Sequence, residues 1–529
     1  MTVSTSPLRK ETSRARELLP VLLVLAAIAV FQASTMRAGD PWSDDSAQYI
    51  EHARNISDGA PYDRISFVFH EHGWNPGPRV YPPVFPLLLA PLYHAFGLNL
   101  RPMKFLVLAF FVGSLVLVYF TFRSELGALA GLGLIVTIGF NPFFWDFKDS
   151  VLSDIPFLFL CYSALLLAQE ASSRENSGRR FLVYAALAGL VMYAACGTKT
   201  VGVVMIPAAL VWSLIRRGKI TKSIAAITTI CTALALGEAA ELHVFQAYLK
   251  AHVVQTYQPY SASSVIGQLL PFARFYFGSL SGLWSNGHSS ELRLMFFIFT
   301  LIMMLIGLPI QFLRNLRLHD VFAFFYLPTL LHDQQMRYLI PLIPLYLFYT
   351  LRGALWLIQR APRRFSVVIC SVLVSVVALI YAANYRTLDL HQLAFSTESP
   401  ETQQMFAFIK TQTTQDDVIE FFAPRTLSLY TGRRSSEYIH VPAPTRADLS
   451  RYFRRVGITY VVTSPVVKDL VLSDFVSSNR DCWSAPFSNS MFDVYGVPGG
   501  GCRTRIADDA RLPGKQVTMP IRGRDGDGA

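Results

Sequence analysis

The stretch that decides the fold of this chain is GDPWSDDSAQY, residues 39–49, which directly follows the apolar residues 18–36. It is polar and acidic. Because it follows an apolar segment, its two adjacent carboxylates, Asp44 and Asp45, are expected to lie where the chain leaves a membrane. A polar loop continues from it to the RVYPP motif at residues 79–83. We expect this first outer loop, residues 37–103, to carry a site at a membrane surface.

A short helix and a loop rich in aromatic residues are predicted after the acidic pair. The helix has one apolar face, formed by Tyr49, Ile50, Ala53 and Ile56, and Gly59 ends it. The loop side chains that could line an acceptor or donor site, together with Tyr49, are Tyr62, His70, His72 and Tyr81. For the two histidines, an ordinary position on a surface loop is the simpler interpretation.

Asp45 has two interpretations. With Gln48 three residues later it resembles a capping box, in which the aspartate only caps the helix. Capping also fixes the side chain in space, so the two roles are compatible. Asp45 is therefore kept as a candidate for chemistry, with Asp44 beside it.

The composition indicates a membrane protein. The chain has 529 residues, of which 52% are hydrophobic and 16% are charged, which is too apolar for a soluble protein of this length. The formal charge of +11 could suggest nucleic acid, but the basic residues gather between apolar spans, as the positive-inside rule expects. The sequence shows no Gly-rich phosphate loop and no zinc-type cysteine pair, so a soluble nucleotide or nucleic-acid partner is unsupported.

About eleven transmembrane helices are predicted between residues 18 and 385. The apolar run at 84–97 contains Pro86 and Pro91 and is short, so it suits an interfacial or re-entrant helix in the outer loop. The predicted spans are residues 18–36, 104–122, 128–147, 155–170, 181–195, 200–215, 223–242, 292–313, 321–331, 338–357 and 365–385.

The distribution of Lys and Arg predicts the orientation. Basic residues gather in the tail 1–17 and in segments 174–180, 216–222 and 352–364, whereas the short loops near residues 148, 199 and 337 hold one each. By the positive-inside rule the N-terminus is predicted to be cytoplasmic and the C-terminus extracytoplasmic. The charged residues that look out of place then all fall on the outer side.

The residues after the last span change character. Alternating apolar residues predict strands at 417–422 and 458–462, and helical patterns cover 447–456 and 466–475. Residues 386–502 are therefore expected to form an extracytoplasmic α/β domain, followed by a disordered tail at 503–529. Cys482 and Cys502 both lie in this outer part, flank a hairpin-like stretch, and are predicted to form a disulfide.

Three further outer loops carry ionisable residues. Asp154 ends the run FKDSVLSD at residues 147–154, Lys199 lies between two threonines, and Arg337 precedes the last predicted spans. One alternative is that Asp154 merely caps the next helix and that Lys199 is a lysine whose long side chain reaches the membrane interface. Ionisable residues at a membrane edge are costly, however, so we treat them as functional candidates. Carboxylates can act as a base or hold a metal, and cations can bind a phosphate.

Four of these motifs, in order, resemble GT-C glycosyltransferases such as the protein O-mannosyltransferases and the lipid A aminoarabinose transferase. The first motif is DSAQY (45–49) with ARNI (53–56) and YPP (81–83). The second, third and fourth are SDIPF (153–157), TKTVG (198–202) and RYLIP (337–341). The third motif has Lys199 where arginine is common. Lysine does not form the bidentate contact with phosphate that arginine forms, so this chain departs from the family pattern there. The resemblance covers residues 18–385.

The resemblance implies a polytopic α-helical membrane enzyme in a bacterial inner membrane. It would transfer a hexose or pentose from a polyprenyl-phosphate sugar to a lipid, glycan or protein acceptor in the cell envelope. The configuration of the sugar would be inverted in the transfer. Asp45 would be the general base, with Asp44 in reserve and Asp154 assisting. Lys199 and Arg337 would hold the lipid phosphate. A divalent cation, Mg²⁺ or Mn²⁺, is a further expectation, with Asp45 and Asp154 as its candidate ligands.

A transporter or flippase is the alternative class of function. Transporters tend to have paired halves and discontinuous helices near the membrane midplane. The sequence has no such halves, and its charged residues lie in loops rather than inside spans. A non-catalytic scaffold gives no reason for carboxylates and cations to gather on one side.

Overall fold

The computed structural model describes residues 7–70, 77–175, 178–249, 262–285, 291–332, 334–360, 362–438, 445–467 and 469–498. The chain forms two compact units. We call residues 1–36 and 103–390 the helical unit, and residues 37–102 and 391–529 the mixed unit. The sequence-based division placed the first outer loop with the membrane helices, whereas the contacts group this loop with the residues after 390.

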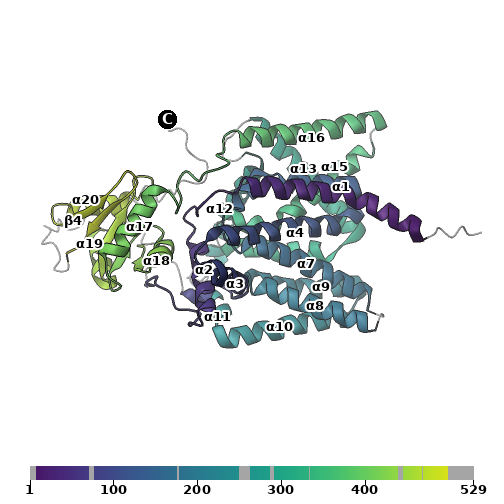
Figure 1. The fold of residues 1–529 in the computed structure, drawn as a ribbon. Helices are drawn as coiled ribbons and strands as arrows, with labels where there is room; N and C mark the ends of the chain where they lie inside the picture. Colours follow the sequence, from purple (N-terminus) through teal and green to yellow (C-terminus); the bar gives the residue numbers. More distant parts are fainter. Residues whose placement is uncertain are drawn as a thin grey trace, which may run out of the picture. The chain divides into compact units, whose positions relative to one another are not determined.

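The helical unit is built from long apolar helices, and Figure 1 shows α4, α7, α8 and α9 running side by side. Its elements are α1 (Pro7–Ser34), α4 (Leu100–Leu126), α5 (Ala128–Gly139), α6 (Pro142–Phe147), α7 (Asp154–Ser173), α8 (Arg179–Cys196), η2 (Thr200–Val204), α9 (Met205–Arg217), α10 (Lys222–Leu242), α11 (Val244–Leu249), α12 (Ala262–Ser285), α13 (Glu291–Asn315), α14 (Leu318–Tyr326), η4 (Leu327–His332), η5 (Met336–Leu339), α15 (Ile343–Ile358) and α16 (Arg363–Tyr385).

Within the described residues, seven helices are long and apolar enough to cross a membrane, and five shorter apolar helices accompany them. The shorter ones are Leu18–Ser34, Val84–Phe96, Ala128–Gly139, Leu318–Leu331 and Ile343–Ile358. Every span predicted from the sequence coincides with a helix or with two consecutive helices. The protein is therefore an integral membrane protein with several apolar spanning helices.

Helices α13 and α15 pack with their backbones in direct contact. A Cβ atom added at Gly307 would overlap the carbonyl oxygen of Tyr349, and one added at Gly353 would overlap that of Met303. Small residues at helix interfaces let backbones approach closely, which is a main source of helix association in membranes. Glycine at these two positions is therefore required by packing.

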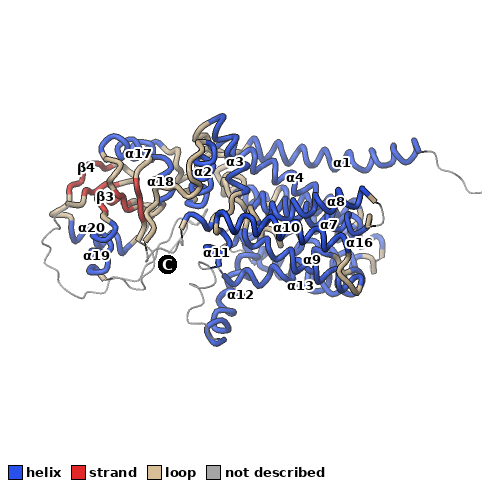
Figure 2. Tube along the Cα trace, turned by 90° about the horizontal axis from the view of Figure 1, so that it is seen from below, coloured by secondary structure: helices blue, strands red, loops and turns tan. Residues whose placement is uncertain are grey.

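The mixed unit combines the first outer loop with an α/β domain. Its elements are α2 (Asp44–Ser57), η1 (Pro78–Val80), α3 (Val84–Phe96), α17 (Pro400–Gln412), β1 (Val418–Glu420), α18 (Pro424–Thr431), β2 (Arg434–Ser436), α19 (Arg446–Val456), β3 (Ile458–Thr463), α20 (Leu470–Asn479), β4 (Ser484–Ser488) and β5 (Asp493–Gly496). The strands, red in Figure 2, form one sheet in the order β2-β1-β3-β5-β4. Strand β1 runs parallel to β2 and β3, and the pairs β3–β5 and β4–β5 are antiparallel.

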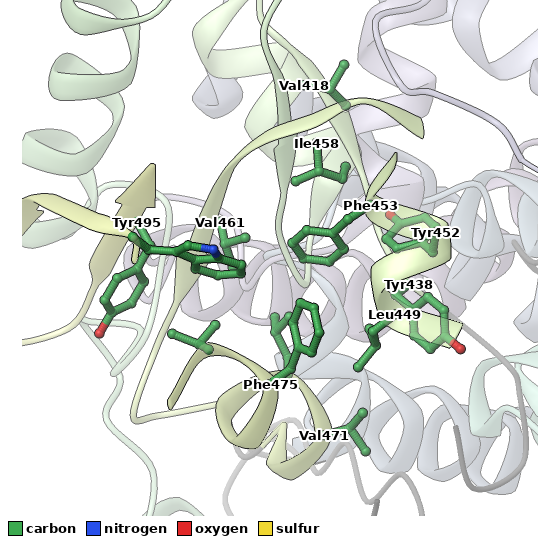
Figure 3. Packing of buried hydrophobic residues seen from close by; sticks show 13 residues of the cluster. Val418, Tyr438, Leu449, Tyr452, Phe453, Ile458, Val461, Val471, Phe475 and Tyr495 are labelled. Carbon is green, nitrogen blue, oxygen red and sulfur yellow. The ribbon is translucent and has the colours of Figure 1, made fainter. Parts of the chain in front are cut away.

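The sheet has an apolar core on each face. Val418 and Val461 belong to the cluster shown in Figure 3, where the rings of Phe453 from α19 and Phe475 from α20 lie 5.1 Å apart between their centroids. The next residue along each strand, Ile419 and Val462, belongs to a second cluster that also holds residues of α17 and α18. This division follows from the alternation of side chains along a strand.

The first outer loop is built into this domain through Phe67 and Trp42, among other contacts. Phe67 forms a parallel bridge with Ser435 of β2, and the Val68 N–H donates to the Ser435 carbonyl at 2.8 Å. Trp42 is buried among five phenylalanine rings, and its φ of 64° lies in the left-handed region. The segment that leads into α2 is therefore anchored by the core of the α/β domain.

Candidate active site

The acidic pair occupies the first turn of α2, and neither aspartate is its N-cap. Ser43 is the N-cap, and its Oγ accepts from the Ser46 N–H at 3.4 Å. The capping interpretation of Asp45 is therefore wrong, because Ser43 is the cap and the helix begins at Asp44. Two carboxylates in the first turn are favourable beside the positive end of the helix dipole.

Asp45 is held by two donors on one of its oxygens. The Tyr81 hydroxyl donates to Asp45 Oδ1, and the Arg425 guanidinium donates to the same oxygen over 3.5 Å. Arg425 Nη1 also donates to the Tyr81 hydroxyl oxygen at 2.5 Å. Three side chains from three segments of the mixed unit thus converge, with Arg425 9% and Asp45 25% exposed.

Asp44 serves the first turn of α18. Its Oδ1 accepts from the Thr426 N–H at 3.1 Å and from the Thr426 hydroxyl at 3.2 Å. The N-cap of α18, Ala423, has no side chain that could do this, so Asp44 caps α18 from α2. Burial raises the pKa of Asp44 to about 6, although Arg425 and the Thr426 hydrogen bond oppose this shift.

Burial and neighbouring charges also shift the pKa values of Tyr81 and Arg425. Burial, reinforced by Asp45, raises the pKa of Tyr81 well above its ordinary value, so Tyr81 stays protonated and can donate. The pKa of Arg425 is raised although burial opposes its charge, because Tyr81, Asp44 and Asp45 surround it. Among the described residues Arg425 Nε has no hydrogen-bond partner, and the guanidinium lies 5.3 Å from the centroid of the Phe67 ring.

A second layer supports Tyr81. The Tyr62 hydroxyl donates to the Tyr81 carbonyl at 2.7 Å, and Tyr62 stacks on His52 with ring centroids 4.1 Å apart. The ring of Tyr49 packs edge-on against Tyr81, with centroids 5.2 Å apart. Buried Glu51 pairs with Arg54 at 2.9 Å, and burial raises the pKa of Glu51. Tyr62 and Tyr49 therefore position Tyr81 in this structure.

The two predicted loop histidines have different outcomes. His70 is partly buried: its Nε2 lies 2.9 Å from the Glu437 carbonyl oxygen, and its ring lies 4.8 Å from that of Tyr452. It therefore fastens the loop to the α/β domain. His72 lies outside the described residues.

A second cluster lies in the helical unit. Asp154 is the first residue of α7, and Lys199, which precedes η2, donates to its Oδ1. Arg337 of η5 lies 3.9 Å from Asp154 Oδ2, and its Nε donates to Gln335 at 2.5 Å. The ammonium of Lys199 also lies 4.3 Å from the centroid of the Tyr338 ring. One carboxylate and two cations leave this cluster with a formal charge of +1.

The structure therefore brings together three of the predicted outer residues, Asp154, Lys199 and Arg337. Lys199 forms an ion pair, whereas a snorkelling lysine would reach for the membrane interface. Asp45 and Asp154 belong to different units, so their predicted gathering at one site stays a prediction. Lys148 pairs with Asp149 at 2.9 Å, and both are buried in the helical unit.

Sequence reasoning missed Arg425. It lies in the segment FFAPRT, residues 421–426, where β1 ends and α18 begins. The carboxyl ends of parallel strands are where α/β sheets place functional groups, so a basic residue there was a usable signal. Its contact with Asp45, 380 residues away, was not foreseeable from the local pattern.

The donor sets do not favour the expected divalent cation. Asp154 already faces Lys199 and Arg337, and Asp45 already faces Arg425. A metal ion on either carboxylate would have to displace or repel a cation. In the described ranges, no three His, Cys, Asp or Glu side chains form a group that could hold a metal ion.

The predicted disulfide is only half described. Cys482 lies just after α20 and is disulfide-bonded, and Cys502 lies outside the described residues. The pairing of these two cysteines stays a prediction. Cys161, Cys196, Cys231 and Cys370 are free thiols.

Comparison with known proteins gives one family and a group of related folds. Residues 80–238 match the family described as dolichyl-phosphate-mannose-protein mannosyltransferase. No curated protein matches the chain. Among solved structures, the oligosaccharyltransferase AglB from Archaeoglobus fulgidus, in complex with an inhibitory peptide and a dolichol-phosphate, aligns with a TM-score of 0.55 at 12% identity, over 84% of this chain and 69% of that one.

Two further solved structures align with the chain. The Archaeoglobus enzyme tethered to an acceptor peptide aligns with a TM-score of 0.56 at 13% identity, over 84% of this chain and 69% of that one. ArnT from Cupriavidus metallidurans bound to undecaprenyl phosphate aligns over 90% of this chain and 97% of that one, at 11% identity, with a TM-score of 0.42. The archaeal enzyme is the one from which the fold is inferred.

Proposed function

Because this chain has the fold of the GT-C glycosyltransferase superfamily, we propose that it transfers a sugar from a polyprenyl-phosphate donor to an acceptor hydroxyl outside the cytoplasm. The cluster of Asp154, Lys199 and Arg337 carries this proposal. A net positive cluster beside a membrane-spanning helix suits a lipid phosphate, and the archaeal structure of the same fold holds a dolichol-phosphate.

Lys199 and Arg337 are proposed to hold the phosphate of the donor. As the bond between the anomeric carbon and the phosphate oxygen breaks, negative charge grows on the leaving polyprenyl phosphate. Cations fixed in advance stabilise that charge more than water does. Asp154 keeps both cations in place, since Lys199 donates to one of its oxygens and Arg337 lies 3.9 Å from the other.

Asp45 is proposed to be the general base. It would take the proton of the acceptor hydroxyl while that oxygen attacks the anomeric carbon from the face opposite the phosphate, which inverts the configuration. Asp44 is the reserve candidate, because the two hydrogen bonds that its Oδ1 accepts from Thr426 give it a structural role as the cap of α18. No metal ion takes part in this scheme.

The test is sugar transfer by the purified protein with a panel of radiolabelled polyprenyl-phosphate sugars and cell-envelope acceptors. We expect transfer from at least one donor, with or without a chelator. Asp45→Asn should lower the rate by about 10²- to 10⁴-fold, as is typical when a general base is removed. Release of no sugar from any donor by wild-type protein would contradict the proposal.

Two matched pairs of variants separate chemistry from stability. Asp44→Asn keeps an oxygen that can cap α18 and should lose much less activity than Asp45→Asn. Lys199→Met should lower activity with every donor, whereas Lys219→Met, an exposed lysine beyond α9, should not. Near wild-type transfer by a folded Asp45→Asn protein would move the base to another carboxylate.

A further inference from the structure

Arg425 belongs to the α/β domain, yet its guanidinium ends at the acidic pair of α2. Its Nη1 lies 2.5 Å from the Tyr81 hydroxyl oxygen and 3.5 Å from Asp45 Oδ1. The side chain is 9% exposed, so this cation is withdrawn from solvent. A buried cation needs compensating charge, and here the compensation comes from the acidic pair.

The directions of the hydrogen bonds follow from chemistry. A guanidinium carries only donors, so the Tyr81 oxygen must be the acceptor of the Arg425 bond. The Tyr81 proton is then directed at Asp45 Oδ1. Asp45 therefore receives one direct and one relayed donor from the same cation, and both favour the ionised, hydrogen-bond-accepting carboxylate.

The first turns of α2 and α18 are also tied together beside this contact. Asp44 accepts two hydrogen bonds from Thr426, the residue that follows Arg425. The acidic pair thus divides its work: Asp44 fixes the start of α18, and Asp45 meets the guanidinium that α18 presents. The rings of Phe67 and Tyr81, with centroids 5.3 and 5.5 Å from the guanidinium carbon, restrict it further.

We propose that Arg425, acting through Tyr81, is a positioning residue that orients Asp45 and keeps it ionised for the transfer reaction. This inference rests on the proposed function, in which Asp45 is the base. It makes the α/β domain a part of the active centre rather than an appendage. Arg425 itself takes no proton and touches no reacting atom in this scheme.

The kinetic test is a double-mutant cycle in the full-length protein. Arg425→Gln should lower kcat by about 10- to 100-fold with little change in KM for the donor, since a displaced catalytic group costs rate. Arg425→Lys keeps the charge and should recover part of the lost kcat. Tyr81→Phe removes the hydroxyl group but keeps the ring, and it should lower kcat as Arg425→Gln does. In an Asp45→Asn background, Arg425→Gln should cause almost no further loss.

The control variants lose an arginine ion pair or a tyrosine hydrogen bond elsewhere in the domain. Arg446→Gln removes an ion pair with Asp474 at 3.0 Å, and Tyr452→Phe removes a hydrogen bond to Glu420 at 2.6 Å. Neither should change kcat. Additive losses in the Asp45→Asn background, or no recovery by lysine, would overturn the inference, because both indicate a general structural defect.

A second measurement does not depend on activity. Water-soluble carbodiimide with an amine attacks protonated carboxyl groups, and peptide mass spectrometry can quantify the product at Asp45 separately from Asp44. At pH 6, Arg425→Gln and Tyr81→Phe should raise the labelling of Asp45 several-fold, and Arg446→Gln should not. Unchanged labelling would overturn the inference. If wild-type protein transferred no sugar, the proposed function would fail, and the labelling would still decide whether Arg425 controls Asp45.

Discussion

His52 shows how burial on α2 fixes the state of a titratable side chain. The ring is buried, its Nδ1 lies 2.7 Å from the Tyr62 carbonyl oxygen, and its Nε2 lies 3.0 Å from the Gln48 amide nitrogen. Neutral histidine satisfies both contacts by donating at Nδ1 and accepting at Nε2. Burial lowers the pKa of His52 to about 4, so the ring is neutral at physiological pH.

The lowered pKa predicts a pH-dependent contribution to stability. Unfolded histidine binds a proton near pH 6.5, so the folded state binds fewer protons between pH 6.5 and about 4. The contribution of His52 is therefore complete above pH 6.5 and is lost as pH falls toward 4. Asp44, whose pKa is raised to about 6, acts in the opposite direction over a similar range.

His52→Gln isolates this contribution. The melting temperature of wild-type protein should exceed that of the variant most at pH 7.5, and the difference should shrink as pH falls to 4.5. Over this pH range, the difference in the free energy of unfolding between the two proteins should change by about 2–3 kcal/mol, since one pKa unit corresponds to about 1.4 kcal/mol. His94→Gln, at an exposed histidine on α3, is the control for the substitution of histidine by glutamine. A difference that is constant with pH would contradict the prediction.

Helices α13 and α15 illustrate how one missing side chain sets an interface. Their backbones meet at Gly307 and Gly353, where any Cβ would overlap a carbonyl oxygen of the opposite helix. In α10, a Cβ at Gly237 would meet no atom within 4 Å apart from its chain neighbours and the backbone of its own helix. The same substitution should therefore have opposite effects at the two places.

Gly307→Ala should destabilise the helical unit by about 1–3 kcal/mol, because the added methyl group forces the helices apart. Gly237→Ala should be neutral or stabilising by up to about 1 kcal/mol, because alanine favours helix over glycine. Thermal unfolding of both purified variants, monitored by tryptophan fluorescence, measures the difference. Equal melting temperatures would show that α13 and α15 can separate without cost.

At the scale of the whole molecule, the orientation in the membrane is predicted from the distribution of charge. The positive-inside rule assigns the basic segments 1–17, 174–180, 216–222 and 352–364 to the cytoplasmic side. The acidic pair, Asp154 and the α/β domain are then predicted to lie on the other side, where a polyprenyl-phosphate sugar and an acceptor would meet.

Reporter fusions test this orientation. Alkaline phosphatase fused after Tyr385 should be active, because it folds only outside the cytoplasm, and the same enzyme fused after Arg217 should be inactive. Green fluorescent protein at the two positions should give the reverse result. Phosphatase activity after Arg217 with none after Tyr385 would invert the topology and contradict an extracytoplasmic site.

The sequence by itself determined the membrane class, the positions of most apolar helices and the residues of the Asp154 cluster, but no predicted span covers α12. Long apolar runs and short charged loops are local features, so a sequence window of about 20 residues is enough to find them. It also located α2 and strands β1 and β3, whose patterns of apolar residues are equally local.

Only the tertiary structure decided that Ser43 caps α2, that Asp44 caps α18 and that Arg425 reaches Asp45. It also placed the first outer loop in the same unit as the α/β domain, through Trp42 and the bridge at Phe67. Apart from the Ser43 cap, which is local, these contacts join residues that are hundreds of positions apart, as with the 380 between Asp45 and Arg425. Such contacts exist because burying the aromatic core brings α18 against α2, and no local pattern of residues encodes that approach.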